Sequence, residues 1–167
     1  LDGTIRTTEI ASGQTRCPQA ELNPAHKDAV MSLSLDPTGR VLASGSRDQL
    51  VGLWRVDGQS GCLTATGAAL QKHRAPVAAL AFDASGRRLA SGGEDAQVVL
   101  WDVEARRLLG LPITSHRRPI SGLVFGSDGW LWSADSETVW RWDVDESRWL
   151  ARACTRAGHN LSQAEWQ

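Results

Sequence analysis

Short runs rich in apolar residues recur along the chain, and each is followed by turn-forming residues. Within each run the apolar residues stand at relative positions 1, 4 and 6, namely Val30, Leu33 and Leu35, then Val77, Leu80 and Phe82, then Ile120, Leu123 and Phe125. The turns that follow contain Gly39, Gly86 and Gly129, residues that adopt a positive φ without steric cost. This pattern predicts short, buried β-strands ending in tight turns.

The runs belong to three copies of one longer repeat, at 26–56, 73–103 and 116–144. The copies begin at His26, His73 and His116, which are 47 and 43 residues apart, and each Gly of the turn follows its His by 13 residues. A second short strand is predicted at 42–44, 89–91 and 131–133. A third ends on Trp54, Trp101 or Trp142, and a fourth fits near Cys62–Ala65 and Leu108–Ile113. Four strands in about 43 to 47 residues predict an all-β repeat protein.

The ends of the repeats carry a recognisable dipeptide. Trp101-Asp102 and Trp142-Asp143 close the second and third copies, while the first has Trp54-Arg55. With four strands per repeat, the chain resembles the WD-repeat β-propeller family. The resemblance implies blades of four antiparallel strands, about three to three and a half of them in an incomplete ring. It covers 1–144, with a partial blade at 1–25, and leaves 145–167 as a separate tail.

The same resemblance implies a buried hydrogen-bonded tetrad of His, Ser, Asp and Trp in each blade. The implied sets are His26, Ser44, Asp48 and Trp54, then His73, Ser91, Asp95 and Trp101, then His116, Ser133, Asp135 and Trp142. In the first set the serine is either Ser44 or Ser46, because both point to one face of a strand. In the third copy the acid stands seven residues before the Trp instead of six. A hydrolase reading of Ser, His and Asp is disfavoured, since catalysis needs one such set and not three in equal register. Trp54 and Trp101 are predicted to be buried.

Composition narrows the classes of function. The 18 Lys and Arg nearly balance 19 Asp and Glu, which argues against a nucleic-acid binder, and no apolar run is long enough for a membrane helix. Cys17, Cys62 and Cys154 fit neither a zinc spacing nor a disulfide framework. We therefore expect three ordinary thiols, a cytoplasmic location, and no metal or cofactor.

Charged residues beside the tetrads mark a candidate partner surface. In the family, the positions after the tetrad His and before the Asp reach one end of the propeller; here they are Lys27, Arg74, Arg117 and Arg118 after the histidines, and Arg47 and Glu94 before the acids. This end is mildly basic and suits an acidic or polar protein partner, the alternative being a solvated face. The resemblance thus implies a non-catalytic scaffold for protein–protein interaction. The other function considered is the sensor or regulatory C-terminal region of a larger multidomain bacterial protein.

The tail at 145–167 abandons the strand pattern. Trp149, Leu150, Ala153 and Cys154 fall at helical spacing, and 162–165 reads as a capping box, so a short helical tail is predicted. It would either dock on the blades or bind a partner. The tail resembles the one that closes many bacterial WD-repeat proteins. Together with the start at Leu1, this suggests a C-terminal fragment of a bacterial protein, whose blades would pack on the rest of the parent propeller.

Overall fold

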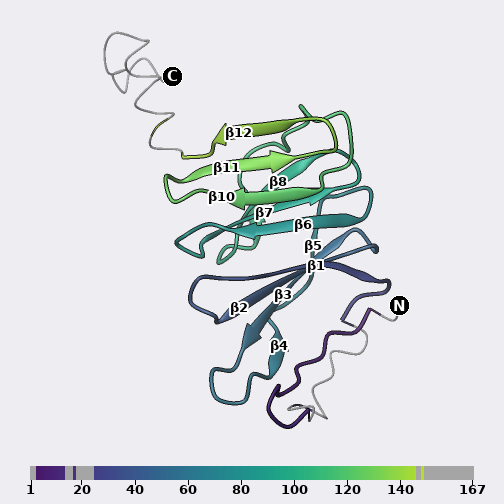
Figure 1. Cartoon of the computed structure of the whole chain (residues 1–167), viewed down its shortest axis with the longest axis vertical. Coiled ribbons are helices and arrows are strands. Elements are labelled where there is room, and N and C mark those ends of the chain that lie inside the picture. Colours follow the sequence, from purple (N-terminus) through teal and green to yellow (C-terminus); the bar gives the residue numbers. More distant parts are fainter. Residues whose placement is uncertain (1–2, 14–16, 18–24, 146–147, 149–167) are drawn as a thin grey trace, which may run out of the picture.

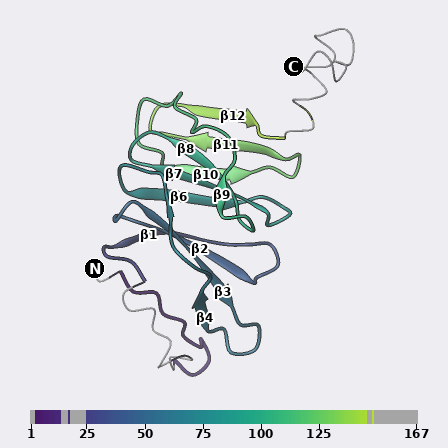
Figure 2. The same cartoon turned by 180° about the vertical axis from the view of Figure 1, so that it is seen from behind.

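A computed structural model describes residues 3–13, 17, 25–145 and 148. Within them the named elements are twelve strands, arranged as three antiparallel sheets stacked face to face (Figures 1 and 2). The all-β class and the antiparallel sheets predicted from the repeat are confirmed. The described strands form a stack and not a closed ring.

The first sheet corresponds to the first repeat, in the order β1-β2-β3-β4 with β5 also paired to β3. Its strands are β1 (Val30–Leu35), β2 (Val41–Ser46), β3 (Leu50–Val56), β4 (Leu63–Ala65) and β5 (Leu70–Gln71). The predicted fourth strand near 62–65 is present as β4, whereas β5 was not expected.

The second and third repeats form the other two sheets in the same order. The second sheet consists of β6 (Val77–Phe82), β7 (Arg88–Gly93), β8 (Val98–Asp102) and β9 (Arg107–Leu108). The third consists of β10 (Gly122–Phe125), β11 (Trp130–Ala134) and β12 (Val139–Asp143). The strand predicted over Leu108–Ile113 is shorter than expected. Gly110 has a φ of 76°, so the chain turns there, and Ile113 returns only as a single bridge to Val98.

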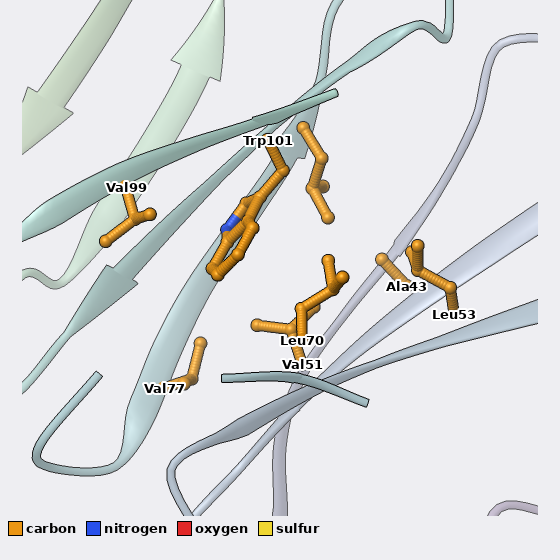
Figure 3. Packing of buried hydrophobic residues seen from close by; sticks show 8 residues of the cluster. Ala43, Val51, Leu53, Leu70, Val77, Val99 and Trp101 are labelled. Carbon is orange, nitrogen blue, oxygen red and sulfur yellow. The ribbon is translucent and has the colours of Figure 1, made fainter. Parts of the chain in front are cut away.

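Two apolar interfaces hold the stack together. Between the first and second sheets lie the buried residues Ala43, Val51, Leu53, Leu70, Val77, Leu89, Val99 and Trp101 (Figure 3). Between the second and third lie Ala79, Ala90, Val98, Ile120, Leu131 and Val144. The alternation along each strand sends one set of side chains to each neighbour, so the middle sheet is covered on both faces.

Glycine permits the close approach of neighbouring sheets at equivalent points. A Cβ on Gly45 would lie 2.7 Å from Val77 Cγ1, and one on Gly92 would lie 2.4 Å from Ile120 Cγ2. The equivalent residue of the third sheet is Ala134. These contacts place the turn between the second and third strands of one sheet beside the start of the next sheet. The same end of each repeat therefore faces the same way.

The cysteine prediction is wrong for two of the three residues. Cys17 and Cys62 form a disulfide, with Cα atoms 5.7 Å apart. A separation of 45 residues gave no sign of this pairing, which depends on the N-terminal segment returning beside the turn between β3 and β4. Cys154 lies outside the described residues.

Several predictions concern the two ends of the chain. Of the partial blade at 1–25, the structure describes 3–13, 17 and 25, where Ile5 and Thr8 occupy single bridge positions. Of the predicted helical tail, only Asp145 and Arg148 are described, so the tail falls outside the structure. No helix in the described part of the chain has the length and apolar character needed to span a membrane.

Candidate binding surface and the networks beneath it

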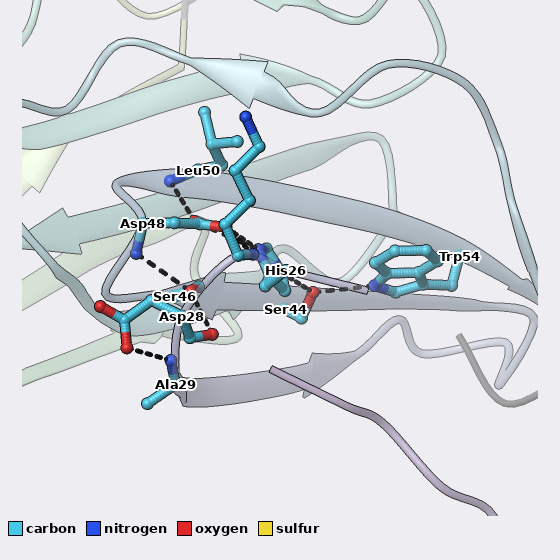
Figure 4. Close-up of polar contacts among 9 residues, drawn as sticks. His26, Asp28, Ala29, Ser44, Ser46, Asp48, Leu50 and Trp54 are labelled. Carbon is cyan, nitrogen blue, oxygen red and sulfur yellow. Dashed lines mark hydrogen bonds and ion pairs between the residues drawn. The ribbon is translucent and has the colours of Figure 1, made fainter. Parts of the chain in front are cut away.

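The first repeat contains a buried chain of hydrogen bonds that joins β2, β3 and the turn between them to the segment before β1 (Figure 4). Trp54 Nε1 donates to Ser44 Oγ at 2.8 Å, Ser44 Oγ lies 2.7 Å from His26 Nε2, and His26 Nδ1 lies 3.0 Å from Asp48 Oδ2. The structure thus places Ser44 in this network. Ser46 instead donates to the carbonyl oxygen of Asp28 and accepts from the backbone N–H of Asp48.

The second repeat has the same geometry. Trp101 Nε1 and His73 Nε2 each lie 2.8 Å from Ser91 Oγ, and His73 Nδ1 is 3.1 Å from Asp95 Oδ1. Trp101 is 3% exposed and Trp54 is 6% exposed, so the predicted burial of both rings is confirmed.

The third repeat brings together the same four residue types despite its different spacing. Ser133 Oγ lies 2.7 Å from Trp142 Nε1 and 2.6 Å from His116 Nε2, and His116 Nδ1 is 2.7 Å from Asp135 Oδ2. The extra residue between Asp135 and Trp142 is taken up by the turn, where Asp135 Oδ1 also accepts the backbone N–H groups of Glu137 and Thr138.

One proton arrangement satisfies every member of these networks. An indole N–H only donates and a carboxylate only accepts, so the serine hydroxyl donates to His Nε2 while His Nδ1–H donates to the Asp. Ser44 and Ser91 are fully buried, and their oxygens receive a Trp N–H. No substrate carbonyl has access to such an oxygen, which argues for a structural role in spite of the triad-like composition.

Two acids of the networks, Asp48 and Asp135, have a pKa below the ordinary value. Burial raises the pKa of Asp48, but hydrogen bonds from the backbone of Lys27 and Leu50 and the proximity of His26 outweigh it and lower that pKa below its ordinary value. In the third repeat the hydrogen bond from His116 is the main cause that lowers the pKa of Asp135 far below its usual range. Asp48 and Asp135 are therefore ionised at neutral pH and act as hydrogen-bond acceptors.

These acids also fix the backbone of the predicted partner surface. Asp48 Oδ2 accepts the backbone N–H of Lys27 at 2.9 Å, and Asp95 Oδ2 accepts that of Arg74 at 2.9 Å. The side chains of Lys27 and Arg74 are exposed. The first two networks therefore each hold the backbone of one basic residue at the end of their sheet.

The other four candidates are exposed at the same end of their repeats. The N–H of Arg47 donates to the carbonyl of Ala29, and that of Glu94 to the carbonyl of Pro76, which sets both beside the turn between the second and third strands. Arg117 and Arg118 follow His116, and Arg118 pairs with Glu137 at 2.9 Å. This salt bridge neutralises Arg118 in part, and Glu137 was not anticipated from the sequence.

The sequence prediction also missed a second cluster, on the outer face of the third sheet. The guanidinium of Arg141 lies 4.3 Å from the ring centre of Trp130 and 5.6 Å from that of Trp132, and that of Arg148 lies 5.2 Å from Trp130. Aligning the repeats would have revealed it, because Trp132 occupies the place of an alanine in the other two copies. Among the described residues no group of three or more His, Cys, Asp or Glu side chains is placed to hold a metal ion.

Comparison with known proteins identifies the repeat. Residues 17–55 and 63–102 each match the family model described as "WD domain, G-beta repeat", the WD40 repeat. These two segments are thus similar to WD40 repeats, a class that generally serves as a non-catalytic scaffold for binding other proteins. The matched segments do not include 116–144, although that repeat folds into an equivalent sheet with its own network.

Two curated relatives share part of the repeat region. Both are described as "Polyadenylation factor subunit 2", from two strains of Cryptococcus neoformans var. neoformans serotype D. Each is 42% identical over 52 residues, which is 31% of this chain but 7% of the relative. The chain thus matches a small part of much longer fungal proteins, and neither relative supports a bacterial source.

Proposed function

We propose that this chain is a non-catalytic interaction module that binds an acidic segment of a partner protein at the basic end of its sheets. One observation carries the proposal: in the first two repeats a buried Asp, itself held by a His, fixes the backbone of an exposed basic residue. Lys27 and Arg74 are the residues fixed in this way. A preorganised cation loses less conformational freedom on binding than a mobile one, which favours recognition.

Charge at this end supports an acidic partner. Lys27, Arg47, Arg74 and Arg117 are exposed there and make no ion pair among the described side chains, whereas Glu94 is the one acidic member of the predicted set. Electrostatic complementarity speeds association and selects partners by sign of charge. A glutamate-rich segment is the simplest ligand of matching chemistry.

The experiment compares charge reversals at opposite ends of the same sheets. The test variant is Lys27→Glu with Arg74→Glu. The matched control is Arg40→Glu with Arg87→Glu, two exposed arginines in the turns between the first and second strands of the first two sheets. Both variants change the net charge equally, and all four side chains lie on the surface.

Binding of a fluorescein-labelled polyglutamate peptide is measured by anisotropy at low and at physiological salt. We expect the test variant to lose about tenfold in affinity and the control about twofold or less, with both losses shrinking as salt rises. Equal losses in the two variants would show that only the net charge matters. That result would overturn the proposed surface.

The remaining sequence-based expectations stay predictions. A bacterial parent with further blades and a regulatory role rests on the tail, which lies outside the described residues. The cytoplasmic location is also a prediction, and the Cys17–Cys62 disulfide weighs against it because such bonds are rare in reducing compartments.

A further inference from the structure

The outer edge of β12 differs from the equivalent edges of the first two sheets. In those sheets the third strand, β3 or β8, is followed by residues that return and pair with its outer edge. The carbonyl of Leu53 accepts the N–H of Thr66 at 3.0 Å, and the carbonyl of Leu100 accepts that of Leu109 at 2.9 Å. No strand of the described chain pairs with the outer edge of β12, because the third sheet ends there.

The strand register shows which backbone groups of β12 are equivalent to the groups of β3 and β8 that form these outer hydrogen bonds. Leu53 pairs with Ala43, Leu100 with Ala90, and Arg141 with Trp132, so the carbonyl of Arg141 is the equivalent acceptor. By the same register Val139 is equivalent to Val98, whose N–H and carbonyl both bond to Ile113. An extended segment paired with this edge could therefore bond to the N–H and carbonyl of Val139 and to the carbonyl of Arg141. These groups are equivalent to those that pair on the outer edges of β3 and β8.

The side chains beside this edge are not those of a sheet-to-sheet interface. Where the first two sheets carry the fully buried residues Ala43 and Ala90, the third carries Trp132, which is 38% exposed. Where they carry Leu53 and Leu100, it carries the exposed Arg141. Small residues allow sheets to approach closely, and this face has a large ring and a charge in their place.

Arg141 gives the edge a chemical preference. Its guanidinium lies over the ring of Trp130, 4.3 Å from the ring centre, and 5.6 Å from the ring centre of Trp132, and none of the described carboxylates pairs with it. Arg148, by contrast, is paired with Asp143 and Asp145. Contact with aromatic rings restricts the motion of an arginine side chain, which favours bidentate binding of a carboxylate by its N–H groups.

The neighbouring residues of the strand are apolar and exposed. Val139 is 68% exposed and Trp140 is 42% exposed, and in a strand they point to opposite faces. A segment paired with β12 would cover Val139 on the face of Arg141 and Trp140 on the other. Exposed large apolar side chains beside an unpaired edge are typical of a site for strand addition.

We propose that the outer edge of β12 binds an extended peptide segment by strand addition, with a Glu or Asp of the peptide opposite Arg141 and apolar residues on either side of it. This site is separate from the basic end surface, because it uses a strand edge and not the turns. The acid's backbone N–H would donate to the carbonyl of Arg141, as Thr66 does to Leu53.

The test uses a labelled peptide of sequence Ser-Thr-Val-Glu-Val-Thr-Ser and two altered forms. One has Lys in place of Glu, and the other has an N-methyl group on the Glu, which removes its N–H. We expect the Glu peptide to bind the whole 167-residue chain and each altered form to bind about tenfold more weakly. The Lys peptide loses the ion pair, and the methylated peptide loses the strand hydrogen bond.

Variants of the protein locate the site. Arg141→Ala should weaken the Glu peptide about tenfold, and Arg141→Glu should reverse the preference between Glu and Lys peptides. The matched control is Arg55→Ala, an exposed arginine on β3 whose partner strand is already present, since Arg55 pairs with Thr64. It should leave binding unchanged. Far-UV circular dichroism confirms that each variant is folded, and Arg141→Lys, which keeps the charge, should retain more affinity than Arg141→Ala.

Four results would overturn the proposal. They are no binding of the Glu peptide, equal binding of the N-methyl peptide, equal loss in the Arg55 and Arg141 variants, or loss of binding in the variant that reverses Lys27 and Arg74. The last would assign the peptide to the basic end surface. Conversely, failure of polyglutamate to bind that surface leaves the β12 experiment unaffected, so the two proposals fail separately.

Discussion

Replacing Ser91 by Ala tests whether the repeated networks hold the sheets together. Ser91 is fully buried, and its hydroxyl joins the indole N–H of Trp101 to the imidazole of His73, each at 2.8 Å. The substitution removes the hydroxyl without adding volume and leaves both partners in place. Trp101 and His73 are 3% and 4% exposed, so water cannot readily replace the lost bonds.

The magnitude follows from the two groups left without a partner. Each costs about 1–3 kcal/mol, so Ser91→Ala should lower the free energy of unfolding by about 2–6 kcal/mol. That is a large part of the 5–15 kcal/mol of an ordinary domain. The control Ser127→Ala, at an exposed position in the turn before β11, should change it by less than about 0.5 kcal/mol.

Urea denaturation followed by tryptophan fluorescence measures both variants. A shift of the midpoint with an unchanged slope reports stability alone. A double-mutant cycle with Trp101→Phe separates the hydrogen bond from the loss of ring volume, and the two substitutions should be less than additive. If Ser91→Ala and Ser127→Ala behave alike, the network contributes nothing to the fold and our account of it is refuted.

Three further predictions concern packing, the disulfide and acid. Gly92→Ala should destabilise the chain by about 1–3 kcal/mol in urea melts, because its Cβ would meet the next sheet, whereas Gly122→Ala, with its nearest atom 3.9 Å away, should be tolerated. Reducing the Cys17–Cys62 bond should lower the free energy of unfolding by up to about 4 kcal/mol, because the bond closes a loop of 45 residues. Thiol titration of the unreduced protein should find one free thiol per chain. A result of three free thiols would contradict the pairing. The free energy of unfolding should fall as the pH drops below about 4, because the pKa of Asp48 is lower in the folded chain than in the unfolded chain. The ionised Asp48 stabilises the fold above its unfolded pKa, and this stabilisation is lost as the pH falls through its folded pKa. Asp48→Asn should flatten this dependence in melts across the acid range.

The repeat itself made most of the fold predictable. Each sheet is marked by a His, a Gly and a Trp that recur in the same order. They recur because each sheet buries its faces only against neighbouring sheets, so every copy is under the same packing constraints. The tetrads followed from the same register. The choice between Ser44 and Ser46 did not, because both lie on one face of β2 and only the position of the His26 ring separates them.

Features that depend on a single copy escaped prediction. The disulfide joins Cys17 and Cys62, which lie before and after the first repeat and have no equivalent beside the other copies. The stacking of Arg141 on Trp130 is likewise unique to the third sheet. Such contacts depend on which distant segments lie side by side in the fold. The repeat pattern describes each copy separately and so does not predict these contacts.

Hydrogen–deuterium exchange with and without the polyglutamate peptide tests the central claim most directly, because it locates binding without any substitution. The account predicts slower exchange at the basic end, in 25–29 and 72–76, where Asp48 and Asp95 hold the backbone of Lys27 and Arg74. Exchange in the opposite turns, 36–40 and 83–87, should not change. Protection of those turns, or of neither end, would contradict the claim that the buried networks present a binding surface.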